Sequence, residues 1–366
     1  MNEALADWAA LALTPGIGPS SFLRLLACFG SASVAVHESR GSLAVCLDAK
    51  QLDSWFSGEG RRAAEAALAW AQGAGCSLLT LNDDDYPTRL AESDSPPPLL
   101  FARGRRELLA QDMLAMVGSR RATPQGLQTA RLFAQKLGEQ GYTIVSGLAS
   151  GIDAAAHEGA LATPASSIAV IGTGIDRVYP SSNRALAHRL AEHGLILSEF
   201  ALGAGPLAGH FPQRNRILAG LTRGCLVVEA TLDSGSLITA RLSLESGREV
   251  MAVPGSILSP QSRGCHRLIK QGARLVESVD DILEEVGTAI AADTEAAKPA
   301  AEQDVASVDD PAIEALLAEM GYDAVALDTL LARLRLTAEA IYPMLLELEI
   351  QGRVASLPGG CYQRLR

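Results

Sequence analysis

The sequence has few aromatic residues and lacks paired cysteines and long apolar runs, three features that often assign a chain to a class of protein. Aromatic residues make up only 4% of the 366 residues, and the six cysteines are scattered, with no Cys-x-x-Cys pair. Scattered cysteines favour small core residues in a reducing compartment over a disulfide framework or a metal site. No apolar run approaches twenty residues, and Glu3 and Asp7 interrupt a signal-peptide layout at the N-terminus. The sequence therefore predicts a globular cytoplasmic protein with no membrane segment and no metal.

Positive charge is also scarce, since 31 Lys and Arg residues stand against 42 Asp and Glu residues, for a net charge of −11. This shortage does not exclude nucleic acid, because the charges are unevenly placed. Residues 101–274 hold 19 basic and 12 acidic residues, whereas residues 1–100 hold 6 and 12, and residues 286–366 hold 6 and 13. Electrostatic binding depends on the local field. The basic middle of the chain is therefore where an anionic ligand is expected.

Short apolar runs alternate with helix-like runs through this basic middle, and most apolar runs end in Gly or another small residue. Buried parallel strands are short continuous hydrophobic runs joined by helical crossovers. The pattern predicts an α/β fold, a doubly wound and mostly parallel Rossmann-like sheet with its ligand site beyond the carboxyl ends of the strands. The predicted strands are Met113–Val117, Tyr142–Val145, Ile168–Ile171, Leu195–Leu197, Leu226–Val228 and Val250–Val253.

The length of the chain predicts several domains. Residues 1–100 form a small helical domain of the SAM or helix-hairpin-helix kind, ending where Pro96, Pro97 and Pro98 interrupt regular structure. Residues 101–286 form the Rossmann-like domain, and residues 287–310, poor in large apolar side chains, form a linker. Residues 311–366 give three amphipathic segments and a hairpin, the pattern of a C-terminal winged helix.

Three features of the flanks have two interpretations each. The turn Pro15–Gly18 presents N–H groups to a phosphate or forms a packing corner, and the scarcity of nearby cations favours packing. The prolines at 96–98 are a docking ligand or buried packing, and the second is favoured. The third helix of the tail carries Glu339, Glu347 and Glu349 but no Lys or Arg. Carboxylates repel phosphates, so a protein contact is favoured over DNA there.

The stretch Phe211–Arg216 carries the densest chemistry. Arg214 and Arg216 stand at the start of a predicted helix, where positive side chains oppose the helix dipole. That placement indicates an anionic ligand, and Phe211 beside them is suited to stack on a base. The alternative keeps Phe211 in the core and pairs the arginines with Glu199 or Glu229.

Several strand-to-helix turns share the same edge. In Gly118-Ser119-Arg120, the glycine lets the backbone approach a phosphate closely and the arginine supplies a planar guanidinium that matches phosphate geometry. No Gly-x-Gly-x-x-Gly motif follows the first strand, which counts against an NAD-binding domain. Asp153 and His157, four residues apart, form a catalytic or metal pair or else a helix N-cap and its neighbour, and the structural alternative is favoured. The segment Ser234–Ser236 caps a helix and is suited to hold a phosphate.

Together these stretches resemble the DNA-processing protein A family (DprA/Smf). The resemblance lies in Val-Gly-Ser-Arg at 117–120, Ser-Gly-Leu-Ala-Ser-Gly-Ile-Asp at 146–153 with His157, Tyr-Pro at 179–180, Phe-Pro-Gln-Arg-Asn-Arg at 211–216, Val-Glu-Ala at 228–230, Ser-Gly-Ser-Leu-Ile-Thr-Ala at 234–240 and Val-Pro-Gly at 253–255. It implies a non-enzymatic recombination mediator without a cofactor. Such a protein binds and protects incoming single-stranded DNA in natural transformation, forms a homodimer through the sheet domain, and loads RecA recombinase onto DNA coated by single-strand-binding protein.

The patterns and the resemblance together give one set of expected DNA contacts: Gly118, Ser119, Arg120, Gly147, Gly151, Arg184, Phe211, Arg214, Asn215, Arg216, Gly235, Ser236 and Lys270. Leu268 and Ile269 are the expected dimer positions. The sequence departs from the family at Ser181 and Ser182, where a lysine is often found. A nucleotide hydrolase or phosphoribohydrolase of related architecture, using Glu229 with Asp153 and His157, is the alternative function.

Overall fold

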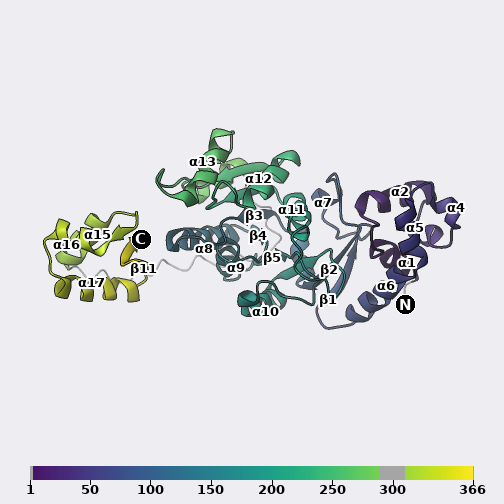
Figure 1. Cartoon of the computed structure of the whole chain (residues 1–366), viewed down its shortest axis with the longest axis horizontal. Helices are drawn as coiled ribbons and strands as arrows, with labels where there is room; N and C mark the ends of the chain where they lie inside the picture. The colour runs from purple at the N-terminus through teal and green to yellow at the C-terminus, as the bar shows by residue number, and fades with distance from the viewer. Residues whose placement is uncertain (1–2, 288–309, 366) are drawn as a thin grey trace.

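The computed structural model describes residues 3–287 and 310–365 (Figure 1). Its central sheet consists of β1 (Cys76–Thr80), β2 (Leu99–Gly104), β3 (Met113–Val117), β4 (Thr143–Ser146), β5 (Ser167–Val170), β6 (Leu195–Ser198), β7 (Gly224–Val227), β8 (Glu249–Ala252) and β9 (Arg274–Leu275). The nine strands lie in the order β1-β2-β6-β5-β4-β3-β7-β8-β9. Strands β3 to β9 pair in parallel, whereas β2 pairs antiparallel with both β1 and β6.

Helices cover both faces of this sheet. The helices of residues 3–287, including those of the N-terminal part that do not touch the sheet, are α1 (Glu3–Ala12), α2 (Pro19–Phe29), α3 (Ala32–Ala35), α4 (Arg40–Leu43), α5 (Ala49–Phe56), α6 (Glu59–Trp70), α7 (Thr88–Ala91), α8 (Pro124–Glu139), α9 (Ile152–Ala160), α10 (Arg184–His193), α11 (His210–Leu221), α12 (Ser236–Glu245), α13 (Arg263–Lys270) and α14 (Val279–Val286), with 3₁₀ turns η1 (Arg106–Ala110), η2 (Ser181–Asn183) and η3 (Pro260–Ser262). The predicted fold class is confirmed.

Strand β3 shows why this part of the chain folds into layers. Successive side chains of a strand point to opposite faces, and all five residues of β3 are buried. Leu114 and Met116 join the core beneath α8, α9 and α14, whereas Ala115 and Val117 join the core beneath α12 and α13. A strand covered on both sides needs a continuous apolar run, which is why the sequence pattern identifies it.

Each of the six predicted strands is present within two residues of its expected ends. The sequence prediction omits β1, β2 and β9, and its domain boundary near residue 100 falls inside β2. Because β1 pairs with β2, the sheet extends into the region predicted as the first domain. The division into domains otherwise remains a prediction, and the predicted linker at 287–310 lies almost wholly outside the described residues.

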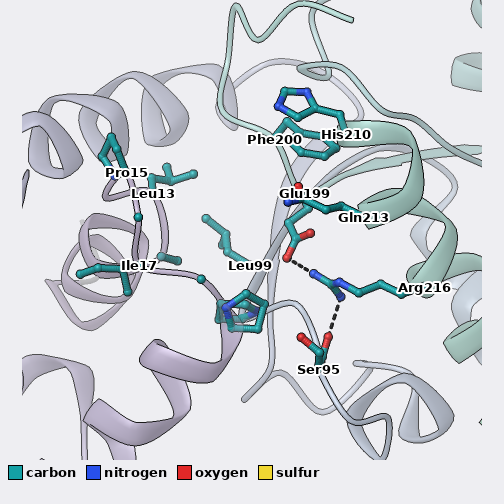
Figure 2. Close-up of a pocket in the computed structure, with 15 residues that line it drawn as sticks. Leu13, Pro15, Ile17, Ser95, Leu99, Glu199, Phe200, His210, Gln213 and Arg216 are labelled. Carbon is teal, nitrogen blue, oxygen red and sulfur yellow. Dashed lines mark hydrogen bonds and ion pairs between the residues drawn. The ribbon is translucent and has the colours of Figure 1, made fainter. Parts of the chain in front are cut away.

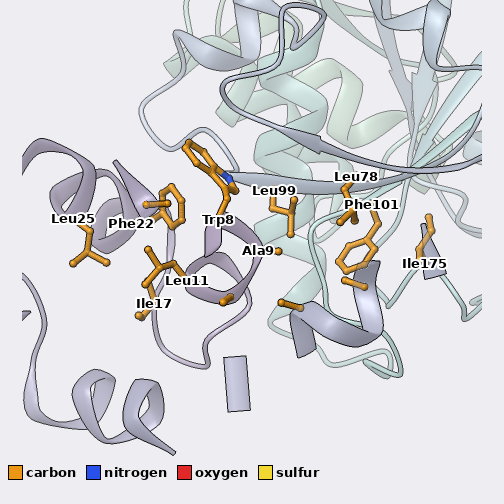
Figure 3. Packing of buried hydrophobic residues seen from close by; sticks show 14 of the residues in the cluster. Trp8, Ala9, Leu11, Ile17, Phe22, Leu25, Leu78, Leu99, Phe101 and Ile175 are labelled. Atoms are coloured by element: carbon orange, nitrogen blue, oxygen red, sulfur yellow. The ribbon is translucent and has the colours of Figure 1, made fainter. Parts of the chain in front are cut away.

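The N-terminal helices pack directly on the first strands of the sheet (Figure 3). The rings of Trp8 and Phe22 are 4.8 Å apart, and Trp8 Nε1 donates to the carbonyl of Pro98 at 2.7 Å. Pro96, Pro97 and Pro98 are all buried, which agrees with the packing interpretation of this stretch. The turn before α2 also serves packing, because Ile17 is buried and Gln51 Nε2 donates to the Gly16 carbonyl at 2.7 Å.

The tail folds as the expected winged helix. It contains α15 (Pro311–Met320), β10 (Val325–Ala326), α16 (Leu327–Leu334), α17 (Ala338–Ile350), β11 (Val354–Leu357) and β12 (Cys361–Arg364). The strands form a small sheet in the order β10-β12-β11, and the helices enclose a separate apolar core. Among residues 3–287 and 310–365, no helix has both the length and the apolar character needed to span a bilayer.

Candidate functional site

A groove opens where the direction of the sheet reverses. The chain runs outward from β3 to β6 and then returns to β7 on the other side of β3. Ligands of open α/β sheets bind at such reversals, outside the carboxyl ends of the strands. Here the loops after β3 and β7 and the first turns of α11 and α12 enclose about 720 Å³, which we call the edge groove. Its lining includes Gly118, Ser119, Arg120, Arg121, Phe211, Arg214, Asn215, Thr231, Asp233, Ser234, Gly235, Ser236 and Gln261.

An exposed cation lies over an aromatic ring at the rim of the edge groove. The guanidinium carbon of Arg120 is 5.5 Å from the ring centre of Phe211, and Arg120 is exposed while Phe211 is half-buried. The ring of Tyr179 stands 5.8 Å from that of Phe211. Among the residues that the structure describes, no carboxylate lies within 4 Å of the Arg120 guanidinium, which is therefore accessible beside the Phe211 ring. This arrangement can contact a phosphate and a planar base at once.

Arg214 belongs to the wall of the groove and to the interior of the protein. It is only 5% exposed, and its Nη1 donates to the carbonyls of Gly147, at 2.6 Å, and Val170. Its Nε donates to Asn215 Oδ1 at 2.9 Å. Burial lowers the pKa of the Arg214 guanidinium to about 10, so it stays charged at neutral pH. Arg214 therefore ties α11 to the ends of β4 and β5 while supplying positive potential under the groove.

Arg216 lies on the opposite face of α11 from the edge groove. It lines a cleft of about 640 Å³ between the N-terminal helices and the sheet, where it pairs with Glu199 and donates to the Ser95 carbonyl at 2.5 Å (Figure 2). The sequence places Arg216 beside Arg120 and Arg214, but the structure separates Arg216 from them because residues two positions apart in a helix point to nearly opposite sides. The pairing with Glu199 corresponds to the alternative that the sequence left open.

The glycines at the turns serve close packing more than ligand contact. Gly151 has a φ of +80°, and a side chain there would strike the Ser119 carbonyl. A side chain at Gly147 would overlap the Arg214 guanidinium, and one at Gly118 would meet Ile152. Gly147 and Gly151 are absent from the groove lining, and the lack of a side chain at each lets the surrounding loops pack closely. Gly118 lies in the lining and holds the β3 loop close to α9.

Asp153 and His157 do not bond to each other. Asp153 Oδ2 accepts from the backbone N–H groups of Gly147 and Ala149, at 3.2 and 3.3 Å. The prediction that Asp153 is the N-cap of the helix is wrong, because the N-cap of α9 is Gly151. His157 Nδ1 lies 2.7 Å from Ser167 Oγ, and burial, with the nearby Arg214 charge, lowers its pKa to about 3. The ring is therefore neutral and structural. In the described part of the chain, no three His, Cys, Asp or Glu side chains form a group able to hold a metal.

Glu229 is also engaged in holding the fold. Its two carboxylate oxygens accept from the Thr123 backbone N–H at 2.9 Å and from Thr123 Oγ1 at 2.6 Å, which fixes the start of α8. Burial raises the pKa of the Glu229 carboxyl, and the Thr123 hydrogen bonds oppose that shift. A general base needs a free acceptor within reach of substrate. Glu229 therefore offers little to the hydrolase alternative.

The remaining predicted contacts fall into two groups. Ser119, Gly235 and Ser236 line the groove, and Gly235 has open space where a side chain would be. Arg184, at the start of α10, and Lys270, at the end of α13, are exposed but absent from the groove lining. The list of expected DNA contacts omits Arg121, although it adjoins Arg120 and lines the groove. It also omits Gln261, which no motif marks because it reaches the groove from the turn before α13.

A second, apolar groove of about 670 Å³ runs between α12 and α13. Leu268 lines it together with Leu244 and Leu232, which are 66% and 46% exposed. Ile269, the other expected dimer position, is partly buried against the core beneath α12 and is not in this lining. Leu268 is also partly buried against that core, so the two neighbours differ only in that Leu268 lines the groove.

Comparisons with known proteins agree with the fold. Residues 77–287 match the family described as DNA recombination-mediator protein A, and residues 295–360 match the DprA winged helix domain. Protein Smf of Escherichia coli is 42% identical over 84% of this chain and 82% of its own length. The DNA processing protein DprA of Streptococcus pneumoniae is 50% identical over 57% of this chain and 73% of its own.

Two solved structures are similar as well. The X-ray structure of DNA processing protein A from Streptococcus pneumoniae has a TM-score of 0.68 and 39% identity, covering 76% of this chain and 98% of that one. DNA processing protein A from Helicobacter pylori has a TM-score of 0.53 and 30% identity, covering 57% and 94%. The latter structure was described for its mode of binding single-stranded DNA.

Proposed function

The chain belongs to the DNA recombination-mediator protein A family, and from that premise we propose that it binds single-stranded DNA in the edge groove. The observation that carries this proposal is the exposed guanidinium of Arg120 above the accessible ring of Phe211. A cation for the phosphate and an aromatic face for the base is how proteins hold single strands without reading their sequence. Ser236 and the open position at Gly235 provide room for a neighbouring phosphate at the start of α12.

Duplex DNA is the weaker ligand in this proposal. Stacking on Phe211 requires a base whose face is free, and bases in a duplex are covered by their neighbours. Arg184 and Lys270 remain predicted contacts outside the groove, where they would add only phosphate attraction, whereas Arg216 would first have to leave its ion pair with Glu199. Single strands should therefore bind more tightly than duplexes of the same length, by the share of binding free energy that stacking supplies.

Titration with salt tests the site. Affinity for a labelled thymidine oligonucleotide, measured by fluorescence anisotropy, should fall with salt, and each phosphate contact contributes a slope of about −0.7. The double variant Arg120→Ala, Arg121→Ala should bind more weakly with a shallower slope. Arg131→Ala, which removes an exposed arginine paired with Glu158 on α9, is the control and should match the parent chain. Parent-like affinity and slope in the double variant would refute the edge groove as the site.

The wider role proposed here is that of a cytoplasmic mediator without catalytic activity. It protects incoming single strands during natural transformation and loads RecA recombinase onto DNA coated by single-strand-binding protein. The family match supports the mediator role. RecA-dependent ATP hydrolysis on single strands coated by single-strand-binding protein should begin after a shorter delay when the parent protein is present than when it is absent. With the Arg120→Ala, Arg121→Ala double variant, the delay should be as long as without the protein. An unchanged delay with the parent protein would reject the loading step.

The proposed assembly is a homodimer through the groove between α12 and α13. Leu244 and Leu232 expose large apolar surface beside Leu268, and such surface is stabilised when a partner covers it. Leu244→Asp should shift the sedimentation coefficient toward the monomer. Leu207→Asp is the matched control, because Leu207 is 61% exposed but lies outside this groove. A dimer that survives Leu244→Asp would place the interface elsewhere.

A further inference from the structure

The third helix of the winged helix exposes an apolar stripe. Tyr342, Leu346 and Ile350 are spaced four residues apart on α17 and are 51%, 59% and 79% exposed. Residues spaced in this way lie on one face of a helix. The inward face is made by Ile341, Leu345 and Leu348, all buried in the tail's own core. The stripe therefore contributes nothing to the packing of its own domain.

Carboxylates border this stripe. Glu339 precedes Tyr342 by one turn, and Glu347 and Glu349 adjoin Leu346 and Ile350. None of the three is in an ion pair among the described residues. Glu347 accepts from Gln351 Nε2 at 3.1 Å and Glu349 from Ser356 Oγ at 2.7 Å, so within the described ranges each carboxylate has a neutral hydrogen-bond donor and no cation beside it. Pro343 has no N–H and cannot donate to the Glu339 carbonyl, which leaves a further acceptor beside the first carboxylate.

We propose that α17 is a docking site for a basic amphipathic segment of another protein. A helix or strand with an apolar stripe flanked by Lys or Arg would cover Tyr342, Leu346 and Ile350 and pair with Glu339 and Glu349. Amphipathic segments laid against a partner's apolar face are a recurrent mode of recognition, and complementary charge at the rim selects the partner and its orientation.

Other occupants fit this surface less well. Nucleic acid would bring phosphates against three carboxylates. A second copy of the same helix would bring like charges together, because a two-fold interface pairs each patch with itself. Residues 288–309 of the chain carry one lysine against five acidic residues, so they do not supply the basic flanks. Charge complementarity thus points to a basic segment from a different protein.

The test uses full-length protein and synthetic peptides of about 18 residues, roughly five helical turns. The probe has leucines on one face flanked by lysines, and two matched peptides replace the lysines by glutamates or the leucines by serines. Anisotropy should show saturable binding of the probe and at least about tenfold weaker binding of both matched peptides. The double variant Leu346→Ser, Ile350→Ser should weaken probe binding by about tenfold or more, as expected when two buried aliphatic side chains are lost.

Two controls separate the alternatives. Leu207→Ser and Leu258→Ser, which remove exposed leucines elsewhere, should leave the affinity for the probe unchanged. Glu339→Gln with Glu349→Gln should weaken binding at low salt and little at high salt. No saturable binding, an affinity insensitive to Leu346→Ser with Ile350→Ser, or displacement of the probe by duplex DNA would overturn the proposal. A change in sedimentation of the Leu346→Ser, Ile350→Ser protein without peptide would overturn it in favour of self-association.

Discussion

Two helices of this protein are the first candidates for contact with DNA, and their polar side chains carry opposite charges. Helix α11 begins with Phe211 and Arg214 at the edge groove, beside Arg120. Helix α17, the third helix of the winged helix, carries Glu339, Glu347 and Glu349 and an exposed apolar stripe. A fold resembling known DNA-binding domains thus presents an acidic surface, and the sheet presents a cationic one. Function follows the side chains at the surface and not the fold.

The comparison also separates two uses of a positive charge. Arg120 is exposed and free to meet a ligand, whereas Arg214 is buried and bonded to main-chain carbonyls. Both lie within one groove, but removing them should have different consequences. Loss of Arg120 should affect binding alone, and loss of Arg214 should affect stability first.

The largest effect is expected for Arg214→Ala. The change leaves the carbonyls of Gly147 and Val170 without their donor and Asp153, a fully buried carboxylate, without the positive charge that favours its ionised form. Breaking a buried charge network in this way costs about 3–5 kcal/mol of unfolding free energy. Urea unfolding followed by circular dichroism measures the loss. Arg120→Ala should change the unfolding free energy by less than about 0.5 kcal/mol, as is usual for exposed sites, and equal losses in the two variants would contradict the distinction.

The next largest effect compares the half-buried ring of Phe211 with the exposed ring of Tyr342. Phe211→Ala should weaken single-strand binding by about 10- to 100-fold, the equivalent of one stacked base. Tyr342→Ala, on α17, should weaken it less than about twofold, because no strand reaches that helix in the proposed complex. Anisotropy with the same oligonucleotide measures both, with thermal unfolding to check that each variant folds. A larger loss from Tyr342→Ala than from Phe211→Ala would reverse the assignment of the two helices.

An acid-dependent loss of stability is expected from His157 beneath the groove. Its pKa falls from 6.5 to about 3 on folding, so below pH 6.5 the unfolded chain gains a proton that the folded chain does not. Stability contributed by the neutral ring is complete above pH 6.5 and is lost as the pH falls, by up to about 1.4 kcal/mol per pH unit. His157→Gln retains a donor toward Ser167 Oγ and lacks this titration. Its unfolding free energy should therefore fall less steeply between pH 6.5 and about pH 5, and parallel curves would show that His157 is not buried neutral.

Much of the sheet could be predicted from the sequence because buried parallel strands leave a local signal. The run Met113–Val117 is apolar throughout since helices cover both of its faces. Strands β1 and β2 gave a weaker signal, because β1 is half-exposed at its start and β2 ends in Arg103 and Gly104. The place of β2 beside β6 depends on pairing across roughly a hundred residues, which periodicity does not encode.

The site was predicted in its residue types but not in its geometry. Helix position indicates that Arg214 and Arg216 meet an anionic ligand or else pair with Glu199 or Glu229, yet the side of α11 that each faces depends on how the helix docks on the sheet. Three-dimensional packing turns Arg214 toward Gly147 and Arg216 toward Glu199. Gln261 could not be identified at all, because only the fold brings the turn before α13 to the groove.

The smallest expected effect is the most direct check on the contrast between the two helices. The triple variant Glu339→Gln, Glu347→Gln, Glu349→Gln removes three negative charges from α17 without changing its shape. If the strand lies only in the edge groove, long-range repulsion is screened beyond roughly 8 Å at physiological salt, and single-strand affinity should change less than about twofold. A large gain in affinity in anisotropy titrations at that salt would mean that the carboxylates face the bound strand. In that case the winged helix would border the DNA path, and the apolar stripe beside those carboxylates could not be occupied by a protein partner at the same time.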